Sequence, residues 1–333
     1  MGELAELGST TRGVWTRKQA LAVTTRGRID ALVRRGEWQA PWSGVYADGG
    51  YALDLEQRGF AAVLASGGGQ PHRDIHGKEV VAAVACGRLA ARLHDLPLVD
   101  DRDPATGGRE HLLDDVALRW GGSPLHSTTS DGQTRTLTRH RRRYTAEQVL
   151  QLPSGLHVTS YAQTLVDCAL LLQSDSLVCL LDALLHRELL STADLDVLVR
   201  QQRWQAGLTP LREAVRLADG RAESPHETLV RLVLKPHLPG LEPQQRLYDE
   251  SGRILARFDL ADRRLRLAVE ADGKAGHAGT RMAARDQRRD RISDARGWRT
   301  ERCVWFETRC RQKVLVARVL ATARDQERRH TLS

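Results

Sequence analysis

The feature that most constrains this chain is a pair of acids inside an apolar, strand-like run. Residues 265–272 read LRLAVEAD, so Glu270 and Asp272 alternate with apolar neighbours. Because side chains alternate between the two faces of a strand, the two acids share one face. A buried carboxylate needs a compensating partner, so the run indicates a site. A preceding strand over 253–260 carries Asp259, eleven residues before Glu270.

Clustered carboxylates of this kind favour a hard divalent cation. Carboxylate oxygens are ligands for Mg²⁺ or Mn²⁺, and such an ion can polarise a phosphodiester and activate water. We therefore expect Asp259, Glu270 and Asp272 to be metal ligands and catalytic residues. In the alternative interpretation, these acids lie on hairpin surfaces and pair with arginines. The apolar run around Glu270 favours the site.

The positive charge of the chain lies in its last third. The net charge is +8. Residues 221–333 hold 25 Lys/Arg against 16 Asp/Glu, whereas residues 1–220 hold 25 against 26. A basic domain on a neutral remainder indicates a polyanionic partner, here DNA. A solvated, arginine-rich surface is the alternative.

Residues 221–333 predict the element order αβββαβα. Ser224, Pro225 and Glu227 have the spacing of a helix N-cap, N1 and capping box. The expected helices cover 224–234, 280–296 and 309–323, and the expected strands cover 244–249, 253–260, 265–272 and 298–306.

Arginines recur along the charged 280–296 segment and just beyond it. An arginine fork can bind phosphate bidentately. The candidate nucleic-acid-binding residues here are Arg281, Arg285, Arg288, Arg289 and Arg302. Asp286, Asp290 and Asp294 repeat every four residues, so some of these arginines are equally compatible with pairs inside the helix.

Residues 14–47 predict two short helices and a hairpin. Thr16 and Thr25 are suited to cap helices over 17–23 and 27–35, and WQAPWSGVY over 38–46 fits two strands around a turn. Such a unit can place its second helix in a major groove. Arg28, Arg34 and Arg35 are the candidate DNA contacts, and the tryptophans are expected to pack.

The fold class is thus a multi-domain α/β protein. We expect a winged-helix domain over 1–50, a mixed α/β middle region over 51–220, and a nuclease-like domain over 221–333. The middle region predicts helices over 52–65 and 80–94, and a helical pair within 160–200. Its basic run over 139–144 is compatible with phosphate contact or with a solvated strand edge. The function of this region is not indicated.

The composition indicates a soluble, cytoplasmic protein. No apolar run approaches the ~20 residues that a bilayer requires, so no membrane partner is expected. The five cysteines are odd in number and never spaced as CxxC, which favours reduced thiols.

The N-terminal segment resembles the winged-helix domain of AbiEi-type antitoxins. The resemblance rests on the threonine-led first helix, Arg34-Arg35-Gly36 and Gly44-Val45-Tyr46. It implies promoter DNA binding and a cognate toxin partner; a homodimer is a further candidate assembly. The middle region resembles the segment that follows this domain in actinobacterial proteins.

The last third resembles the PD-(D/E)XK nuclease superfamily, with a restriction-endonuclease-like fold. The branch it resembles is akin to very-short-patch-repair endonucleases. The matching residues are Glu227 with Arg231, Phe258-Asp259-Leu260, Val269 to Gly273, His277, the 285–290 segment, and Gly297-Trp298 with Arg302.

This resemblance implies that Asp259 and Glu270 bind the metal, that Asp272 is a companion ligand, and that Glu227 is a further carboxylate. The superfamily usually has lysine where this chain has Asp272, which leaves Lys274 and His277 as candidates for that catalytic role. Two functions follow: a Mg²⁺-dependent endonuclease, or an antitoxin-type regulator whose nuclease-like domain is inactive.

Overall fold

The computed structural model describes residues 6–67, 72–73, 79–80, 83–100, 112–118, 120–128, 134–201, 208–272 and 291–331. These form two compact units. The first is built mainly from the described residues up to Leu172, and the second from Gln173 to Arg200 and from Thr209 onward. Helices and mixed sheets occur in both units, which confirms a multi-domain α/β fold. The predicted division at residues 50 and 220 stays a prediction.

The N-terminal part of the first unit has the predicted two helices and hairpin. The Thr16 and Thr25 hydroxyls cap the helices by accepting from the Gln19 and Arg28 N–H groups. The strands pair in the order β1-β3-β2. Trp38 packs edge-on to Trp15, as expected for core residues. The elements are β1 (Val14–Thr16), α2 (Arg17–Val23), α3 (Arg26–Arg34), β2 (Trp38–Trp42) and β3 (Val45–Asp48), after a short 3-10 turn, η1 (Ser9–Thr11).

The rest of the first unit is a sheet in the order β10-β11-β6-β7-β9-β8 with helices packed on it, and a separate β4-β5 pair. The helices are α4 (Leu55–Ala65), α5 (Gly87–Leu93) and α6 (Tyr161–Ala169). The strands are β4 (His72–Arg73), β5 (Glu79–Val80), β6 (Ala83–Cys86), β7 (Leu112–Leu118), β8 (Gly122–Thr128), β9 (Thr134–Arg141), β10 (Val149–Gln151) and β11 (His157–Thr159), with η2 (Ala146–Gln148) before β10.

The predicted helix over 80–94 is wrong in its first half. Residues Ala83–Cys86 form strand β6, which pairs with β7 and β11, and only Gly87–Leu93 are helical. Gly87 has φ 51°, a left-handed conformation that marks the change from strand to helix. A short, fully buried apolar run fits either structure, and here the neighbouring strands decide.

Several side chains of the basic run over 139–144 pair with buried carboxylates. The run as a whole is therefore neither an open phosphate site nor a solvated strand edge. His140 lies 2.8 Å from the buried Asp115, and Arg142 pairs with the buried Asp167, whose other oxygen accepts from the Tyr144 hydroxyl. Burial opposes ionisation of Asp115, but hydrogen bonds from Arg88 and His140 lower its pKa to about 2. These side chains therefore serve as partners of buried carboxylates inside the unit.

The second unit begins with helices that the sequence division assigned to the middle region. The helical pair predicted within 160–200 is present as α7 (Ser174–His186) and α8 (Thr192–Gln201), after α6, which ends at Ala169. The Asp182 carboxylate of α7 accepts hydrogen bonds from Arg231, Thr228 and the Asp219 N–H, at 2.7, 2.7 and 2.6 Å. The helices are α7 (Ser174–His186), α8 (Thr192–Gln201) and α9 (Thr209–Leu217).

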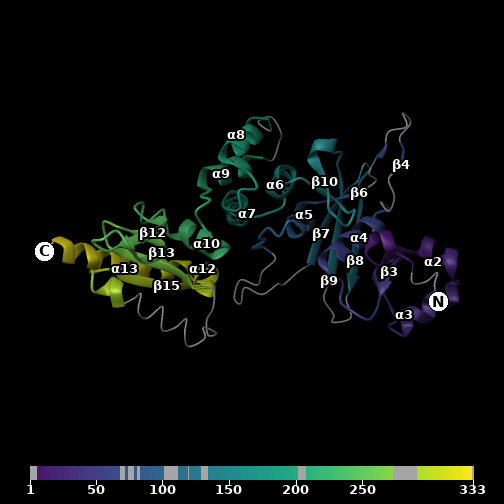
Figure 1. Cartoon of the computed structure of the whole chain (residues 1–333), viewed down its shortest axis with the longest axis horizontal. Helices are drawn as coiled ribbons and strands as arrows, with labels where there is room; N and C mark the ends of the chain where they lie inside the picture. Colours follow the sequence, from purple (N-terminus) through teal and green to yellow (C-terminus); the bar gives the residue numbers. More distant parts are fainter. Residues whose placement is uncertain are drawn as a thin grey trace. The chain divides into compact units, whose positions relative to one another are not determined.

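The rest of the second unit is a sheet in the order β12-β13-β14-β15 with α10 and α13 on one face (Figure 1). Val269 and Leu267 pack against these helices, whereas Ala268 packs with Phe258 and Trp298 in another cluster. This confirms the predicted alternation along the third strand. The elements are α10 (Pro225–Leu234), β12 (Glu242–Tyr248), β13 (Ile254–Asp262), β14 (Leu267–Asp272), β15 (Arg299–Val304), α12 (Trp305–Cys310) and α13 (Gln312–Thr331).

The described residues follow the predicted order from α10 to β15, but two helices, α12 and α13, follow β15 where one was predicted. Residues 273–290, which hold most of the predicted 280–296 helix, lie outside the described residues. All five cysteines are free thiols, as expected. Within the described ranges, no helix has both the length and the apolarity needed to cross a membrane.

Candidate active site

A row of polar residues crosses the sheet of the second unit. Glu270 on β14 pairs with Arg302 on β15. The β13–β14 register, extended by one residue, sets Asp259 opposite Glu270. The β12–β13 register sets Gln244 opposite Asp259. Directly opposite residues are near neighbours in a sheet, so the predicted ligands Asp259 and Glu270 come from adjacent positions on adjacent strands.

The ladders become irregular at Asp259. Regular pairing of β13 with β14 covers only Leu260–Asp262, and pairing of β12 with β13 omits Gln244 and Asp259. The Asp259 carboxylate instead accepts the Ala271 N–H at 2.9 Å. Residues two apart on a regular strand lie on the same face. Phe258 and Leu260 pack in different hydrophobic clusters instead, so the regular alternation of faces is broken between them. The sheet therefore departs from regular pairing beside Glu270.

The first helix of the predicted nuclease-like domain, α10, carries a buried carboxylate that interacts with Asp259. Ser224 caps α10 and Pro225 occupies its first turn, as predicted. The expected capping box is wrong, because Glu227 does not bond back to the cap. Its Oε2 accepts from the Glu223 N–H at 3.0 Å and from Gln244 Nε2 at 2.9 Å. Burial raises the pKa of Glu227, and the Asp259 charge raises it further.

This raised pKa makes a pH-dependent prediction for Glu227→Gln. A carboxyl whose pKa is higher in the folded than in the unfolded chain favours folding below its ordinary pKa. That contribution is lost as pH rises through the folded value. Metal-free Glu227→Gln should therefore melt above the unsubstituted protein at neutral pH. The difference should shrink to nothing as pH falls through the ordinary glutamate range, about 4.3.

Thermal melts from pH 4 to 8 in the presence of a chelator would measure this difference. Glu250→Gln is the matched control, because Glu250 is exposed in the β12–β13 turn. A Glu227→Gln protein that melts below the unsubstituted one at neutral pH would contradict the electrostatic account.

Asp272 is the last residue of β14 and lies beside β15. Its carboxylate lies 3.4 Å from Arg302, which the sequence suggested as a nucleic-acid contact. His226, the helix neighbour of Glu227, also faces this end: its Nε2 lies 3.1 Å from the Thr308 hydroxyl. Burial lowers the pKa of His226, while the Asp272 charge raises it. The imidazole is thus a neutral polar group beside the acids at neutral pH.

The carboxylates of this site suit a hard divalent cation that is bound by only a few protein ligands. Glu227 is buried beside Asp259, and a cation would relieve the repulsion between them. In the described part of the chain, no three acidic, histidine or cysteine side chains converge into a ready-made cage. Mg²⁺ usually keeps several waters and takes only one or two carboxylates from a protein. Asp259 and Glu270 would be those ligands.

Several predicted site residues lie outside the described residues. These are the candidate catalytic residues Lys274 and His277 and the candidate DNA contacts Arg281, Arg285, Arg288 and Arg289. Their roles stay predictions.

The candidate DNA contacts of the first unit lie on or next to α3. Arg28 and Arg34 are exposed. Arg35 is exposed too, but its guanidinium pairs with Glu37 at 2.7 Å.

Sequence reasoning missed Gln244 and His226. Gln244 is one of two consecutive glutamines in β12, and only the strand register distinguishes the one opposite Asp259. His226 could have been noticed from its position next to Glu227, at the start of a capped helix. Neither residue type carries a signal strong enough on its own.

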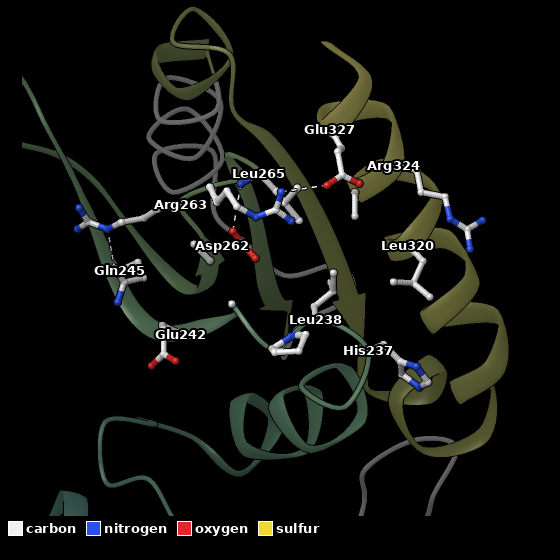
Figure 2. A pocket seen from close by; sticks show the side chains of 15 residues that line it. His237, Leu238, Glu242, Gln245, Asp262, Arg263, Leu265, Leu320, Arg324 and Glu327 are labelled. Atoms are coloured by element: carbon white, nitrogen blue, oxygen red, sulfur yellow. Dashed lines mark hydrogen bonds and ion pairs between the residues drawn. The ribbon is translucent and has the colours of Figure 1, made fainter. Parts of the chain in front are cut away.

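A cavity of about 630 Å³ lies elsewhere in the second unit (Figure 2). It is lined by the β13–β14 turn, α13 and the loop after α10, and it contains none of the predicted acids. Its buried Asp262 accepts the Leu265 N–H at 3.0 Å, and its Arg264 pairs with Glu327. The polar groups of Asp262 and Arg264 thus have hydrogen-bond or ion-pair partners within the fold. The row of polar residues that contains Asp259 and Glu270 remains the stronger candidate site.

The chain belongs to a family that includes proteins of Mycobacterium tuberculosis. "Uncharacterized protein Rv2248" from strain H37Rv is 30% identical over 296 residues, which are 89% of this chain and 96% of the relative. "Uncharacterized protein MT2308" from strain CDC 1551 matches to the same extent. No protein-family model matches the sequence. The alignment is long enough to extend into both compact units.

Proposed function

We propose that the chain is a metal-dependent, DNA-directed endonuclease of the PD-(D/E)XK type, with an N-terminal winged helix that holds the duplex. The observation that carries the proposal is the alignment of Asp259 with Glu270 across adjacent strands, at the point where regular pairing fails. The Asp259 charge also acts on Glu227, a buried carboxylate of α10.

Each residue of the site has a separate role in the proposed phosphodiester hydrolysis. A bound Mg²⁺ or Mn²⁺ would polarise the phosphate and lower the pKa of a coordinated water. Asp259 and Glu270 would hold the cation, and the Ala271 N–H fixes the Asp259 carboxylate in place. Glu227 adds negative charge on the α10 side. Arg302 balances Asp272 and offers a guanidinium to the phosphate backbone.

A cleavage assay tests the proposal. Purified full-length protein is incubated with duplex, single-stranded and mismatched DNA, each with Mg²⁺, Mn²⁺ or a chelator. We expect metal-dependent strand scission of at least one substrate. No scission of any substrate with either metal would overturn the nuclease proposal.

The winged-helix part of the proposal makes a separate prediction about salt. Arg28 and Arg34 are exposed on α3, so the double variant Arg28→Ala/Arg34→Ala should bind duplex DNA more weakly. The slope of log affinity against log salt should fall by about 2, roughly one for each lost phosphate contact.

Fluorescence anisotropy over a salt series measures this slope. Arg12→Ala is the matched control, because Arg12 is already paired with Asp54 and Glu56. An unchanged slope in the double variant would remove α3 from the DNA interface.

A second candidate function is an antitoxin-type transcriptional regulator with a cognate toxin partner. The favouring observation is Asp272, which stands where the resembling nucleases carry lysine and is paired with Arg302. This regulator would bind DNA near its own promoter, with no scission under any metal. The cleavage assay and the anisotropy series together separate the two functions. Either function, together with the free thiols, supports a cytoplasmic location.

A further inference from the structure

The residue opposite Asp259 on the edge strand has an unusual backbone. Gln244 adopts φ 52°, in the left-handed region that non-glycine residues rarely occupy. The residues on either side of it, Pro243 and Gln245, pair regularly with β13. A strained residue between two regularly paired neighbours persists only where the surroundings require it, and such residues cluster at functional sites.

The strained backbone directs the Gln244 side chain at the buried acid of α10. Gln244 Nε2 donates to Glu227 Oε2 at 2.9 Å. The Gln244 Oε1 atom is buried, and among the described residues no donor lies within hydrogen-bond distance of it. One end of the amide therefore holds Glu227, and the other end leaves a buried acceptor on the residue that the strand register sets opposite Asp259.

From these observations we infer that Gln244 is a positioning residue for a hydrated divalent cation. It orients Glu227 toward Asp259 through Nε2, and its Oε1 accepts a hydrogen bond from a water of the cation. A neutral amide is suited to this place, because a further carboxylate would add repulsion whereas a carbonyl oxygen adds only an acceptor. This inference rests on the proposed metal-dependent function.

Substitution by glycine separates positioning from mere structural support. Glycine adopts left-handed φ at no steric cost, so Gln244→Gly should keep or raise the melting temperature. The same variant should bind Mn²⁺ about 10–100-fold more weakly, the usual effect of removing a partner that orients a metal ligand. Gln244→Asn retains the amide but is one methylene shorter, so it should not restore affinity. A purely structural role predicts a lower melting temperature with unchanged affinity.

The measurement is calorimetric titration of metal-free, full-length protein with Mn²⁺, alongside thermal melts. Gln245→Ala is the matched control, since the neighbouring glutamine contacts Arg263 and the Pro243 carbonyl instead. Unchanged Mn²⁺ affinity in both Gln244 variants, with loss of binding in Asp259→Asn, would overturn this inference and leave the proposed function standing. Absence of Mn²⁺ binding by the unsubstituted protein would overturn both.

Discussion

Asp259→Asn should abolish metal-dependent DNA cleavage while leaving the fold intact. Asparagine keeps an oxygen that can accept the Ala271 N–H, so the local structure survives. The lost negative charge weakens cation binding and the charge stabilisation that depends on it. We expect the cleavage rate to fall by on the order of 10³ or more, measured under single-turnover conditions with Mn²⁺.

Glu270→Gln should have an effect of the same size, and the double variant should be little slower than either single variant. Ligands of one cation act as a unit, so their losses are not additive. Asp249→Asn is the control, because Asp249 serves only the β12–β13 turn and its pair with Arg253. Activity within tenfold of the unsubstituted rate in Asp259→Asn, with circular dichroism unchanged, would sink the site assignment.

The second large effect is expected on stability, from Asp182→Ala. Asp182 and Arg231 are 1% and 7% exposed, and their side chains lie 2.7 Å apart. Removing Asp182 leaves a buried guanidinium without its carboxylate and also takes an acceptor from Thr228. Loss of one partner of a buried pair costs about 3–5 kcal/mol, so the free energy of unfolding of the second unit should fall by that amount.

Hydrogen exchange of the full-length protein measures this loss of stability, as faster exchange in peptides from α7 and α10. Glu327→Ala is the matched control, because the Glu327–Arg264 pair is exposed at both ends, and it should leave exchange unchanged. If exchange over α10 in Asp182→Ala stays as slow as in the unsubstituted protein, the pair does not hold these helices together.

The parts of this fold that could be predicted are those with local signals. The caps of α2, α3 and α10 follow from single threonine or serine residues and the neighbouring N–H groups. The alternation in β14 follows from the two-residue period of a strand. Asp259 and Glu270 could be brought together because they lie on consecutive strands. The capping interpretation of Glu227 failed because its Oε2 accepts from the Glu223 N–H and from Gln244 Nε2 instead.

The parts that could not be predicted depend on contacts between distant residues. The run that contains β6 is apolar enough for a helix or a strand, and its partners β7 and β11 decide. The Asp182–Arg231 pair joins residues 49 positions apart, so no local pattern assigns α7 to the second unit. Gln244 and Gln245 are indistinguishable until the register with β13 is known.

The Asp182–Arg231 pair also determines where this chain can be cut. A protein fragment that begins at residue 221 would retain the buried Arg231 and Thr228 but lack the carboxylate that both of them contact. A fragment that begins before Ser174 keeps α7, and with it the Asp182 anchor of α10, the helix that carries Glu227. Excision of the C-terminal half for biochemical work should therefore start ahead of α7, so that the helix carrying the catalytic candidate keeps its support.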